Sequence, residues 1–216
     1  HRVIRTVGRI EYDERKLATA NTKIEGWIEK LHVDYTGRYV QKGEPLAEIY
    51  SPELVATQQE FLNILRWAGQ SQSVKDERTA MLLVKDAQTM LDAAKERLRL
   101  WDISDEQIKK IETTGKPIRT LTIYSPVSGY VLQKMAVQGM RVMPGEKLFD
   151  VVDLSSVWIV ADIYEYELPL IKVGQTARIG LSYFPGKEFS TQVDYIYPAL
   201  ASETRTAKVR FTIPNP

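Results

Sequence analysis

The stretch Gly37–Leu46 reads GRYVQKGEPL, and the stretch Gly139–Leu148 reads GMRVMPGEKL. Five positions recur with the same internal spacing, in the pattern Gly-x-x-Val-x-x-Gly-Glu-x-Leu. A further glycine precedes each copy, Gly26 by eleven residues and Gly129 by ten. Agreement at five spaced positions indicates an internal repeat rather than two unrelated hairpins.

Each copy is rich in β-branched and aromatic residues that are interrupted by glycine, a pattern typical of short strands joined by tight turns. The glycines suit turn positions with a positive φ angle. Neither half alone can bury a two-sided core, so we expect the halves to pack into one β-sandwich although about 70 residues separate them. Contacts are then expected between the strands near Ile28 and Val40 and those near Val131 and Val142.

Between the copies the hydrophobic period lengthens from 2 to about 3.6 residues, which indicates helices. Ser51-Pro52-Glu53 is a typical helix start, and Gly69 is expected to end the first helix. Seam positions at 4-3 spacing are Leu54, Gln58, Phe61, Leu65 and Ala68 in the first helix and Ala80, Val84, Ala87, Leu91, Ala94, Leu98 and Trp101 in the second. The spacing predicts an antiparallel helix pair, with Met81 and Met90 packing beside the seam.

A third, shorter helix is predicted after this pair. Ser104 and Gln107 form a capping box at its start, and Gly115 and Pro117 end it. We expect the three helices to form a compact unit that shares little core with the β-sandwich.

After the second copy the chain returns to β patterning. Strands are predicted at 157–163, 176–181, 189–197 and 207–213, with a link at 166–171 and a turn at Pro185-Gly186. Several short strands at this spacing indicate a small barrel or sandwich. A strand near residues 6–12 has no partner nearby in sequence and is expected to pair with this C-terminal part.

Composition excludes several classes of protein. The 216 residues include 29 Lys+Arg and 28 Asp+Glu, and a net charge of +1 argues against a general nucleic-acid binder. Cysteine is absent, which removes disulfide scaffolds, cysteine nucleophiles and zinc ribbons. No apolar run approaches the roughly 18–20 residues that a membrane span needs. The chain begins at His1, and we interpret it as a piece of a longer protein.

Few side chains suggest chemistry. His32 is interpreted as a surface or pocket-edge histidine, because no serine or aspartate motif accompanies it. Met140 and Met143 are the only local pair of soft thioether ligands, and we expect them to fill or flank the β core rather than to bind metal. The sequence therefore predicts no catalytic residue, no resident metal site and no cofactor.

The two glycine-punctuated halves resemble the halves of a biotinyl/lipoyl domain, but helices from Pro52 to about Lys116 occupy their junction. That arrangement resembles the periplasmic adaptors, or membrane fusion proteins, of tripartite RND-type efflux systems. The matching motifs are Gly37-x-x-Val40-x-Lys42-Gly43-x-x-Leu46, Ile123-x-Ser125-Pro126-x-x-Gly129-x-Val131 and Thr204-Arg205-Thr206. Within the family, the stretches Gly26–Leu31, Tyr35–Gly37 and Tyr50–Leu54 and the short helical region are most similar to the copper/silver heavy-metal adaptors.

The resemblance implies a mainly β fold with an inserted α-helical unit. A lipoyl-like β-sandwich (barrel-sandwich hybrid) is made of two halves, with a helical hairpin or three-helix bundle between them, and a small β-barrel follows at the C-terminal end. The implied domains are residues 1–10 as part of a membrane-proximal domain, 11–22 with 154–216 as a β-barrel incomplete at its C-terminus, 23–52 with 118–153 as the lipoyl-like domain, and 53–117 as the helical domain.

The resemblance also implies a non-enzymatic role in the periplasm, in association with the inner membrane. The adaptor would bridge an inner-membrane proton-driven RND transporter and an outer-membrane channel, as a ring of its own copies (a hexamer by family resemblance), for export of heavy-metal ions such as Cu(I) or Ag(I). No nucleic-acid partner is implied. The turn between the first two helices would face the channel, and its residues are Gly69, Gln70, Ser71, Gln72, Ser73, Val74 and Lys75.

Two alternatives stay open at this point. An adaptor of drug efflux or type I secretion would share the domain order, although a secretion adaptor would need a longer helical hairpin. A biotinyl/lipoyl carrier domain of an enzyme would need a modifiable lysine at the junction of the halves, whereas Lys42 lies inside one half.

Overall fold

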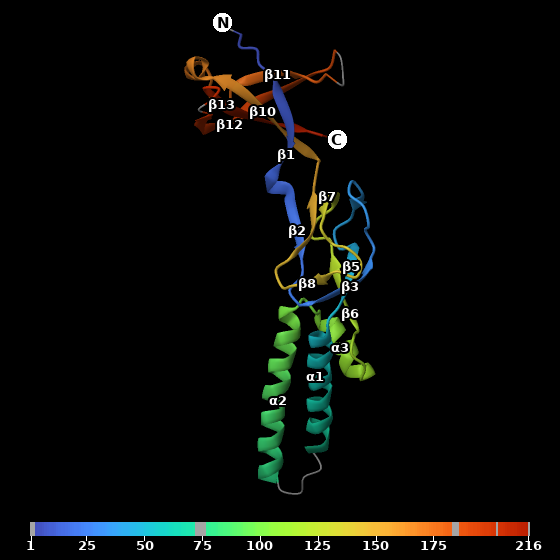
Figure 1. Cartoon of the computed structure of the whole chain (residues 1–216). Coiled ribbons are helices and arrows are strands. Elements are labelled where there is room, and N and C mark those ends of the chain that lie inside the picture. The colour runs from blue at the N-terminus through green and yellow to red at the C-terminus, as the bar shows by residue number, and fades with distance from the viewer. Residues whose placement is uncertain (1–2, 72–76, 183–185, 202, 216) are drawn as a thin grey trace. The chain divides into compact units, whose positions relative to one another are not determined.

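The computed structural model describes residues 3–71, 77–182, 186–201 and 203–215, and it divides into two compact units (Figure 1). The sandwich unit comprises residues 18–151, and the five-stranded unit comprises residues 1–17 and 152–216. Each unit has its own cluster of buried hydrophobic side chains.

Eight strands build the sandwich unit and its margins. They are β2 (Leu17–Asn21), β3 (Gly26–Leu31), β4 (Tyr39–Val40), β5 (Pro45–Tyr50), β6 (Thr120–Tyr124), β7 (Gly129–Lys134), β8 (Arg141–Val142) and β9 (Lys147–Val152). The strands form two four-stranded sheets, in the orders β2-β9-β7-β4 and β6-β5-β3-β8. Each sheet therefore contains strands from both copies of the repeat.

The two copies are structurally equivalent. Exchanging β2 with β6, β9 with β5, β7 with β3 and β4 with β8 converts one sheet order into the other. The backbone hydrogen bonds follow the same exchange, because Gly37 N donates to Val131 O and Gly139 N donates to Ile28 O, each at 2.8 Å. Ile28, Val40, Val131 and Val142 share one buried cluster. The predicted repeat and its packing into a single sandwich are confirmed.

The glycines of the repeat have two different roles. Gly37, Gly43, Gly139 and Gly145 have φ angles of +82° to +86°, as predicted for tight turns. Gly26 instead lies in β3, where a Cβ atom would be 2.3 Å from the carbonyl oxygen of Tyr50. Its missing side chain permits the close approach of β3 to the end of β5.

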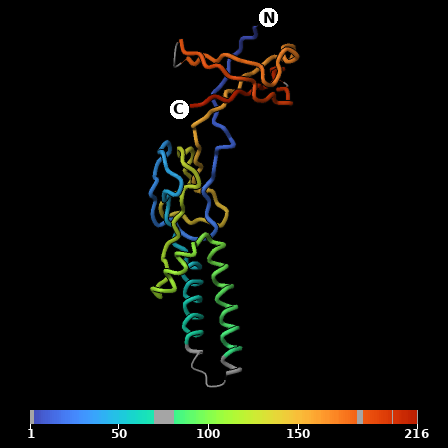
Figure 2. The backbone as a smooth tube through the Cα atoms, turned by 180° about the vertical axis from the view of Figure 1, so that it is seen from behind, coloured from blue at the N-terminus to red at the C-terminus, as the bar shows by residue number. Residues whose placement is uncertain are grey.

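Three helices are inserted between β5 and β6: α1 (Pro52–Ser71), α2 (Glu77–Leu100) and α3 (Asp105–Thr114). The helices α1 and α2 run side by side as a hairpin in both views (Figures 1 and 2). The capping box of α3 is present, and Gly115 adopts the left-handed conformation that ends this helix. The predicted three-helix insertion is therefore confirmed.

The predicted seam is correct in the later turns of α2, near the sandwich, and wrong in the first turns of this helix. Ala87, Leu91 and Leu98 are buried, but Val84 is 41% exposed. Met81 and Met90, predicted to pack beside the seam, are exposed. Heptad spacing identifies the face of a helix but not the point at which its partner stops covering it.

The predicted end of the first helix is also corrected. Gly69 lies inside α1, which continues to Ser71. Apart from its two chain neighbours and the backbone of its own helix, no atom of the described residues lies within 4 Å of the position of its missing Cβ, so the helix continues through this glycine.

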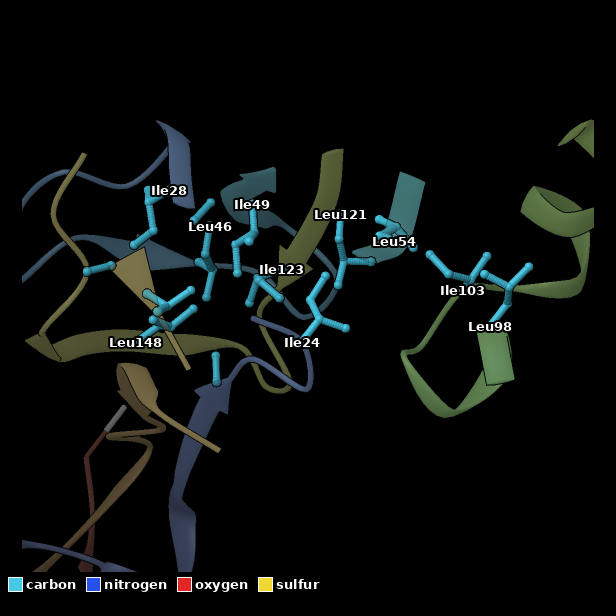
Figure 3. Close-up of a cluster of buried hydrophobic side chains, with 14 of the residues drawn as sticks. Ile24, Ile28, Leu46, Ile49, Leu54, Leu98, Ile103, Leu121, Ile123 and Leu148 are labelled. Atoms are coloured by element: carbon cyan, nitrogen blue, oxygen red, sulfur yellow. The ribbon is translucent and has the colours of Figure 1, made fainter. Parts of the chain in front are cut away.

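The helices and the sandwich share one core, contrary to the sequence-based expectation. Leu54 and Leu98 belong to the same buried cluster as Ile123 and Leu148 of the sandwich. Figure 3 shows Leu54 lying between Leu121 of β6 and Ile103 of the turn before α3. The seam pattern did not predict the shared core, because it shows only which residues of α1 and α2 face each other. Residues in the first turns of α1 and the last turns of α2 also pack against the sandwich.

The buried polar residue Gln58 connects α1 to the chain segment that leads into β6. Its side-chain amide donates to the carbonyl oxygens of Leu54 at 3.0 Å and Ile118 at 2.9 Å, and its Oε1 accepts from Ile118 N at 2.7 Å. The heptad spacing placed Gln58 in the seam of the first helix as its one polar member. In the structure it pairs with the backbone just before β6 and holds the returning chain against α1.

We expect Gln58→Ala to lower the free energy of unfolding of the sandwich unit by about 2–3 kcal/mol, because the partly buried N–H and C=O of Ile118 lose their partner. Urea unfolding followed by circular dichroism measures this loss. Gln59→Ala is the matched control, because Gln59 is the exposed neighbour on the same helix. Equal stabilities of the two variants would contradict the assigned role.

The five-stranded unit is an antiparallel sheet in the order β1-β10-β13-β12-β11. Its elements are β1 (Gly8–Tyr12), η1 (Glu14–Lys16), β10 (Ser156–Tyr164), η2 (Glu165–Leu170), β11 (Thr176–Gly180), β12 (Glu188–Ala201) and β13 (Thr206–Pro214). The N-terminal strand β1 pairs with β10, as predicted. Of the predicted turn Pro185-Gly186, Pro185 lies outside the described residues.

The unit boundaries differ from the implied domain boundaries in two places. Gly8–Ile10 were assigned to a separate membrane-proximal segment, but they pair with β10 inside the five-stranded sheet. The strand β2 was assigned to the barrel, but it lies beside β9 in a sheet of the sandwich. Both segments are short strands whose partners are more than 100 residues away, so local patterning could not assign them.

Candidate docking surfaces

The described residues contain no cluster of three or more histidine, aspartate and glutamate side chains placed to hold a metal ion. The Nε2 atom of His32 lies 2.8 Å from Oε1 of Glu48, whose other oxygen accepts a hydrogen bond from Thr120. His32 therefore links β3 to β5 and β6 as a half-buried structural residue.

The methionine pair of the second repeat occupies two environments. Met140 is partly buried and packs against the hydrophobic cluster, whereas Met143 is exposed. Packing against the β core was predicted for both, and it holds for Met140. In the part of the chain that the structure describes, no helix is both long enough and apolar enough to cross a membrane.

The predicted channel-facing turn lies largely outside the described residues. Gly69, Gln70 and Ser71 form the end of α1, and Gln72–Lys75 fall outside the description. The channel-facing role of this turn stays a prediction.

An apolar surface on α2 was missed by the sequence analysis. Met81, Leu82 and Val84 are all exposed in the first turns of this helix. The run Ala80-Met81-Leu82-Leu83-Val84 carried the signal, because five consecutive apolar residues cannot all face one seam.

One outer face of the sandwich carries exposed aromatic side chains, and we name it the tyrosine face. Tyr39 of β4 and Tyr130 of β7 are direct cross-strand neighbours. Their rings meet edge to face, with centroids 5.2 Å apart. Leu132 is exposed two residues farther along β7. Side chains alternate along a strand, so all three point away from the core that holds Val131.

The outer face of the other sheet combines aromatic rings with arginines, and we name it the arginine face. Trp27 of β3 is paired with Arg141 of β8. The guanidinium of Arg141 lies 5.8 Å from the centre of the Trp27 ring, and its Nε donates to Glu25 at 3.0 Å. Guanidinium groups placed over aromatic rings are held by the attraction of the cation to the π face.

A second arginine stack lies on the same face. The Arg119 guanidinium is 4.6 Å from the centre of the Tyr50 ring, and its Nη2 donates to Glu29 at 2.7 Å. This hydrogen bond is the main reason that the pKa of the Glu29 carboxyl is lowered and the pKa of Arg119 is raised. The two shifts favour the charged forms of both groups, which the ion pair requires.

The five-stranded unit contains a stack of charged side chains around the buried ring of Trp158. Arg210 lies 4.0 Å from the centre of the indole ring and forms an ion pair with Asp194, and Arg15 approaches the ring at 5.5 Å. Hydrogen bonds from Arg15 lower the pKa of Asp13. Every charge in the stack has an opposite partner, so the cluster stabilises the sheet rather than forming an open ion site.

One exposed aromatic surface of this unit lies at the end of β10. Tyr164 and Tyr166 stack with ring centres 5.6 Å apart and an interplanar angle of 13°. Both side chains are exposed. Stacked, exposed aromatic rings are typical of contact surfaces rather than of a catalytic centre.

Comparison with known protein families matches two models. Residues 17–152 match the model described as "CusB, barrel-sandwich hybrid domain", and residues 156–216 match the model described as "CusB-like, beta-barrel domain". The first match spans the sandwich with its helical insertion, and the second spans the C-terminal strands.

The chain is also similar to curated proteins. It is 26% identical over 206 residues to the putative membrane fusion protein SilB of Salmonella typhimurium and 24% identical to the cation efflux system protein CusB of Escherichia coli strain K12. It is 26% identical over 225 residues to the cobalt-zinc-cadmium resistance protein CzcB of Cupriavidus metallidurans. These alignments cover 95–97% of this chain but only 41–46% of the relatives, so the chain spans less than half of their length.

Solved structures share the architecture. ZneB from Cupriavidus metallidurans superposes with a TM-score of 0.63 at 25% identity, covering 98% of this chain and 90% of that one. A MacA–MexA chimera that contains the Pseudomonas aeruginosa MexA α-hairpin domain superposes with a TM-score of 0.68 at 21% identity, covering 98% and 74% of the two chains. The likeness to the chimera is one of fold alone.

Proposed function

The chain belongs to the CusB-like family of membrane fusion proteins of heavy-metal RND efflux, and from this premise we propose that it bridges an inner-membrane RND transporter and an outer-membrane channel for the export of heavy-metal ions. We place this adaptor in the periplasm, in association with the inner membrane, as a ring of its own copies. For the cargo, we propose the soft ions Cu(I) and Ag(I).

The observation that carries this proposal is the order of structural parts along the chain. A sandwich built from two repeat halves is interrupted by a helical hairpin and followed by the five-stranded unit, and both family models match in that order. In the described residues, large apolar and aromatic side chains are exposed on the sandwich and on α2, and no group of three or more histidine, aspartate and glutamate side chains is placed to hold a metal ion. This domain order and these exposed surfaces support the role of an adaptor that binds other proteins.

The hairpin supports a bridging role. Its two helices, of 20 and 24 residues, project a narrow end away from the sandwich (Figures 1 and 2). We propose that the turn at residues 69–75 contacts the outer-membrane channel. The exposed apolar residues Met81 and Leu82 would extend that contact along α2.

The choice of cargo rests on the likeness to the CusB models, because the chain itself provides few ligands. It has no cysteine and two histidines, and soft-metal selectivity requires several converging sulfur ligands. Relatives named for cation efflux and for cobalt, zinc and cadmium resistance are about equally similar in sequence. The cargo therefore has to be tested directly.

The test is metal tolerance in a Gram-negative strain that lacks its own heavy-metal adaptors. The full-length protein that contains this chain is expressed together with its transporter and channel, and growth is measured on Ag(I), Cu(I), Zn(II) and Co(II). We expect restored tolerance to Ag(I) and Cu(I) only. If only tolerance to Zn(II) and Co(II) is restored, the cargo must be reassigned to those ions. If tolerance to none of the four metals is restored, the metal-efflux role is overturned.

Drug efflux is the second candidate function. A specific likeness favours keeping it, because the chain is 25% identical to the macrolide export protein MacA of Yersinia pestis over 94% of this chain. Macrolide tolerance measured in the same strain separates the two candidates. We expect it to be unchanged.

A further inference from the structure

We propose that the cleft bordered by the edge strands β2 and β6 binds an extended peptide segment of a partner protein, which adds to β6 as a further strand of its sheet. This inference goes beyond the proposed function, and it depends on neither the cargo nor the ring of copies. The partner is recognised by backbone hydrogen bonds along one strand, the mode of binding called β-strand addition.

The cleft lies within the sandwich unit and has a volume of about 330 Å³. Its lining includes residues 121–126, at and after β6, and residues 19–21 of β2, with Lys23 and Asp102 beyond the end of β2. Six consecutive residues in extended conformation span about 17 Å from the first to the last. A cleft that follows a strand over this length suits an extended peptide better than a compact ligand.

The strand β6 presents unpaired backbone groups at its outer edge. It is the outermost strand of its sheet in the described residues, with β5 as its one neighbour. The backbone of Ser125 is paired on the β5 side, because its N–H donates to Glu44 O and its C=O accepts from Gly43 N. Backbone groups alternate in direction along an antiparallel strand, so those of Thr122 and Tyr124 face the free edge.

The edges at this cleft lack the features that protect the other sheet edges of the described chain. The opposite edge strands of the sandwich, β4 and β8, have only two residues each. The edge strands of the five-stranded unit carry charges, Arg9 and Glu11 in β1 and Arg178 in β11. In contrast, β2 and β6 have five residues each, with no charged residue and no proline. Proteins usually protect exposed edges by shortness, charge or proline, so two long unprotected edges at one cleft indicate a site for an added strand.

The two copies of the repeat differ here in a way that leaves room beside β2. The backbone hydrogen bonds of Thr22 are equivalent to those of Ser125, which aligns β2 (LATAN) with β6 (TLTIY) position by position. The inward positions of β6 hold Leu121 and Ile123, which belong to the buried cluster (Figure 3). Both equivalent positions of β2 are alanine. A peptide with small apolar side chains at alternate positions fits the space beside these alanines.

The arrangement favours a single peptide strand over the sheet edge of a second folded protein. A strand added to β6 lies about 4.8 Å beyond it, on the side of the cleft that β2 borders. A folded sheet would have to place its own next strand in the space that β2 occupies. The long sandwich edges of a second copy border the equivalent cleft of that copy, so they are not presented outward. The occupant is therefore an extended segment of a partner protein.

The first experiment tethers defined peptides at the cleft, because the chain contains no cysteine of its own. Lys23→Cys places a thiol at the margin of the cleft in the full-length protein that contains this chain. Seven-residue peptides of alternating threonine and alanine carry a cysteine at one end, in two versions for the two strand directions. Disulfide exchange in a glutathione buffer measures how strongly each peptide is retained, because the tether raises its effective concentration.

Methylated peptides test whether the peptide backbone is recognised. One peptide is N-methylated at its odd positions and another at its even positions, so all side chains stay the same. Only one set of amides faces β6, and we expect that peptide to be retained at least tenfold more weakly, by loss of several hydrogen bonds, roughly fivefold for each. The other should be retained like the unmethylated peptide. Equal retention of all three peptides would overturn the proposal.

The second experiment removes one backbone donor from each edge by matched substitutions. Tyr124→Pro and Asn21→Pro alter equivalent positions, and circular dichroism checks that both variants are folded. We expect Tyr124→Pro to weaken retention about fivefold, the effect of one backbone hydrogen bond. Asn21→Pro should leave it unchanged, as should Tyr124→Ala, which removes the same ring but keeps the N–H. Weaker retention in Asn21→Pro alone would place the added strand on β2 and contradict the assignment to β6.

Hydrogen exchange read by mass spectrometry locates the peptide and identifies the source of the strand. In the full-length protein we expect the β6 segment to gain protection when the peptide is tethered, and the β4 and β8 segments to stay unchanged. If β6 is already fully protected without any peptide, and no peptide is retained, another part of the same protein fills the cleft. That result would overturn the assignment of the cleft to a partner protein.

Discussion

Replacing Gly26 with alanine is expected to destabilise the sandwich unit by about 3 kcal/mol, the upper part of the usual range for overpacking. The added Cβ atom would be 2.3 Å from the carbonyl oxygen of Tyr50 and 2.7 Å from Cγ2 of Ile49. Both contacts are shorter than atoms tolerate, and one of them is to backbone. The strands β3 and β5 would have to separate at their paired ends, Trp27 and Tyr50.

Gly69→Ala provides the matched control. Gly69 lies in α1, and among the described residues no atom outside its chain neighbours and its own helix backbone lies within 4 Å of its missing Cβ, so alanine replaces a poor helix former without a clash against them. We expect this variant to be more stable than the wild type by up to about 1 kcal/mol. Urea unfolding followed by circular dichroism compares the two. A Gly26→Ala variant with wild-type stability would show that β3 and β5 approach less closely than the structure places them.

Gly26 also illustrates what the repeat pattern could and could not predict. The pattern identified the glycines of the tight turns, because a positive φ angle is a local requirement that recurs at the same spacing. At Gly26 the requirement for glycine comes from the close approach of Tyr50, which lies in β5 and is 24 residues later in the chain. The sequence shows that a glycine occurs at this position, but it does not show the tertiary contact that requires it.

Local signals predicted the elements well, and tertiary contacts decided the rest. The capping box at Ser104 and the αL glycine at Gly115 are properties of a few neighbouring residues, and both are present. The burial of Gln58 depends on Ile118, which is 60 residues away in sequence. The same limit explains why the sequence indicated a sandwich but not the chemistry of its two outer faces, which arises from cross-strand neighbours such as Trp27 and Arg141.

The shared core makes a second strong prediction. Leu91 of α2 is 6% exposed and belongs to the cluster that extends into the sandwich. Leu91→Asp places an unpaired charge in that cluster, and we expect it to lower the free energy of unfolding by about 4 kcal/mol, at the extreme of single substitutions. The adjacent Met90→Asp is the matched control. Met90 is 49% exposed, so its aspartate stays in water and should change stability little.

Which elements unfold in Leu91→Asp is more informative than how much stability the variant loses. If the helices were an independent module, Leu91→Asp would unfold α1, α2 and α3 and leave the sandwich folded. The shared cluster predicts instead that the strands of the sandwich open together with the helices, because Leu54 and Leu98 pack in the same core as Leu148 of β9. The five-stranded unit has its own cluster around Val209 and should keep its fold.

Hydrogen exchange read by mass spectrometry distinguishes these cases peptide by peptide. In Leu91→Asp we expect faster exchange in peptides from α2, β5 and β9 alike, and wild-type protection in peptides from β10 and β13. Loss of protection confined to the three helices would contradict the shared core and show that the insertion folds separately. Loss in β10 and β13 as well would show that the two units unfold as one, even though their buried clusters are separate.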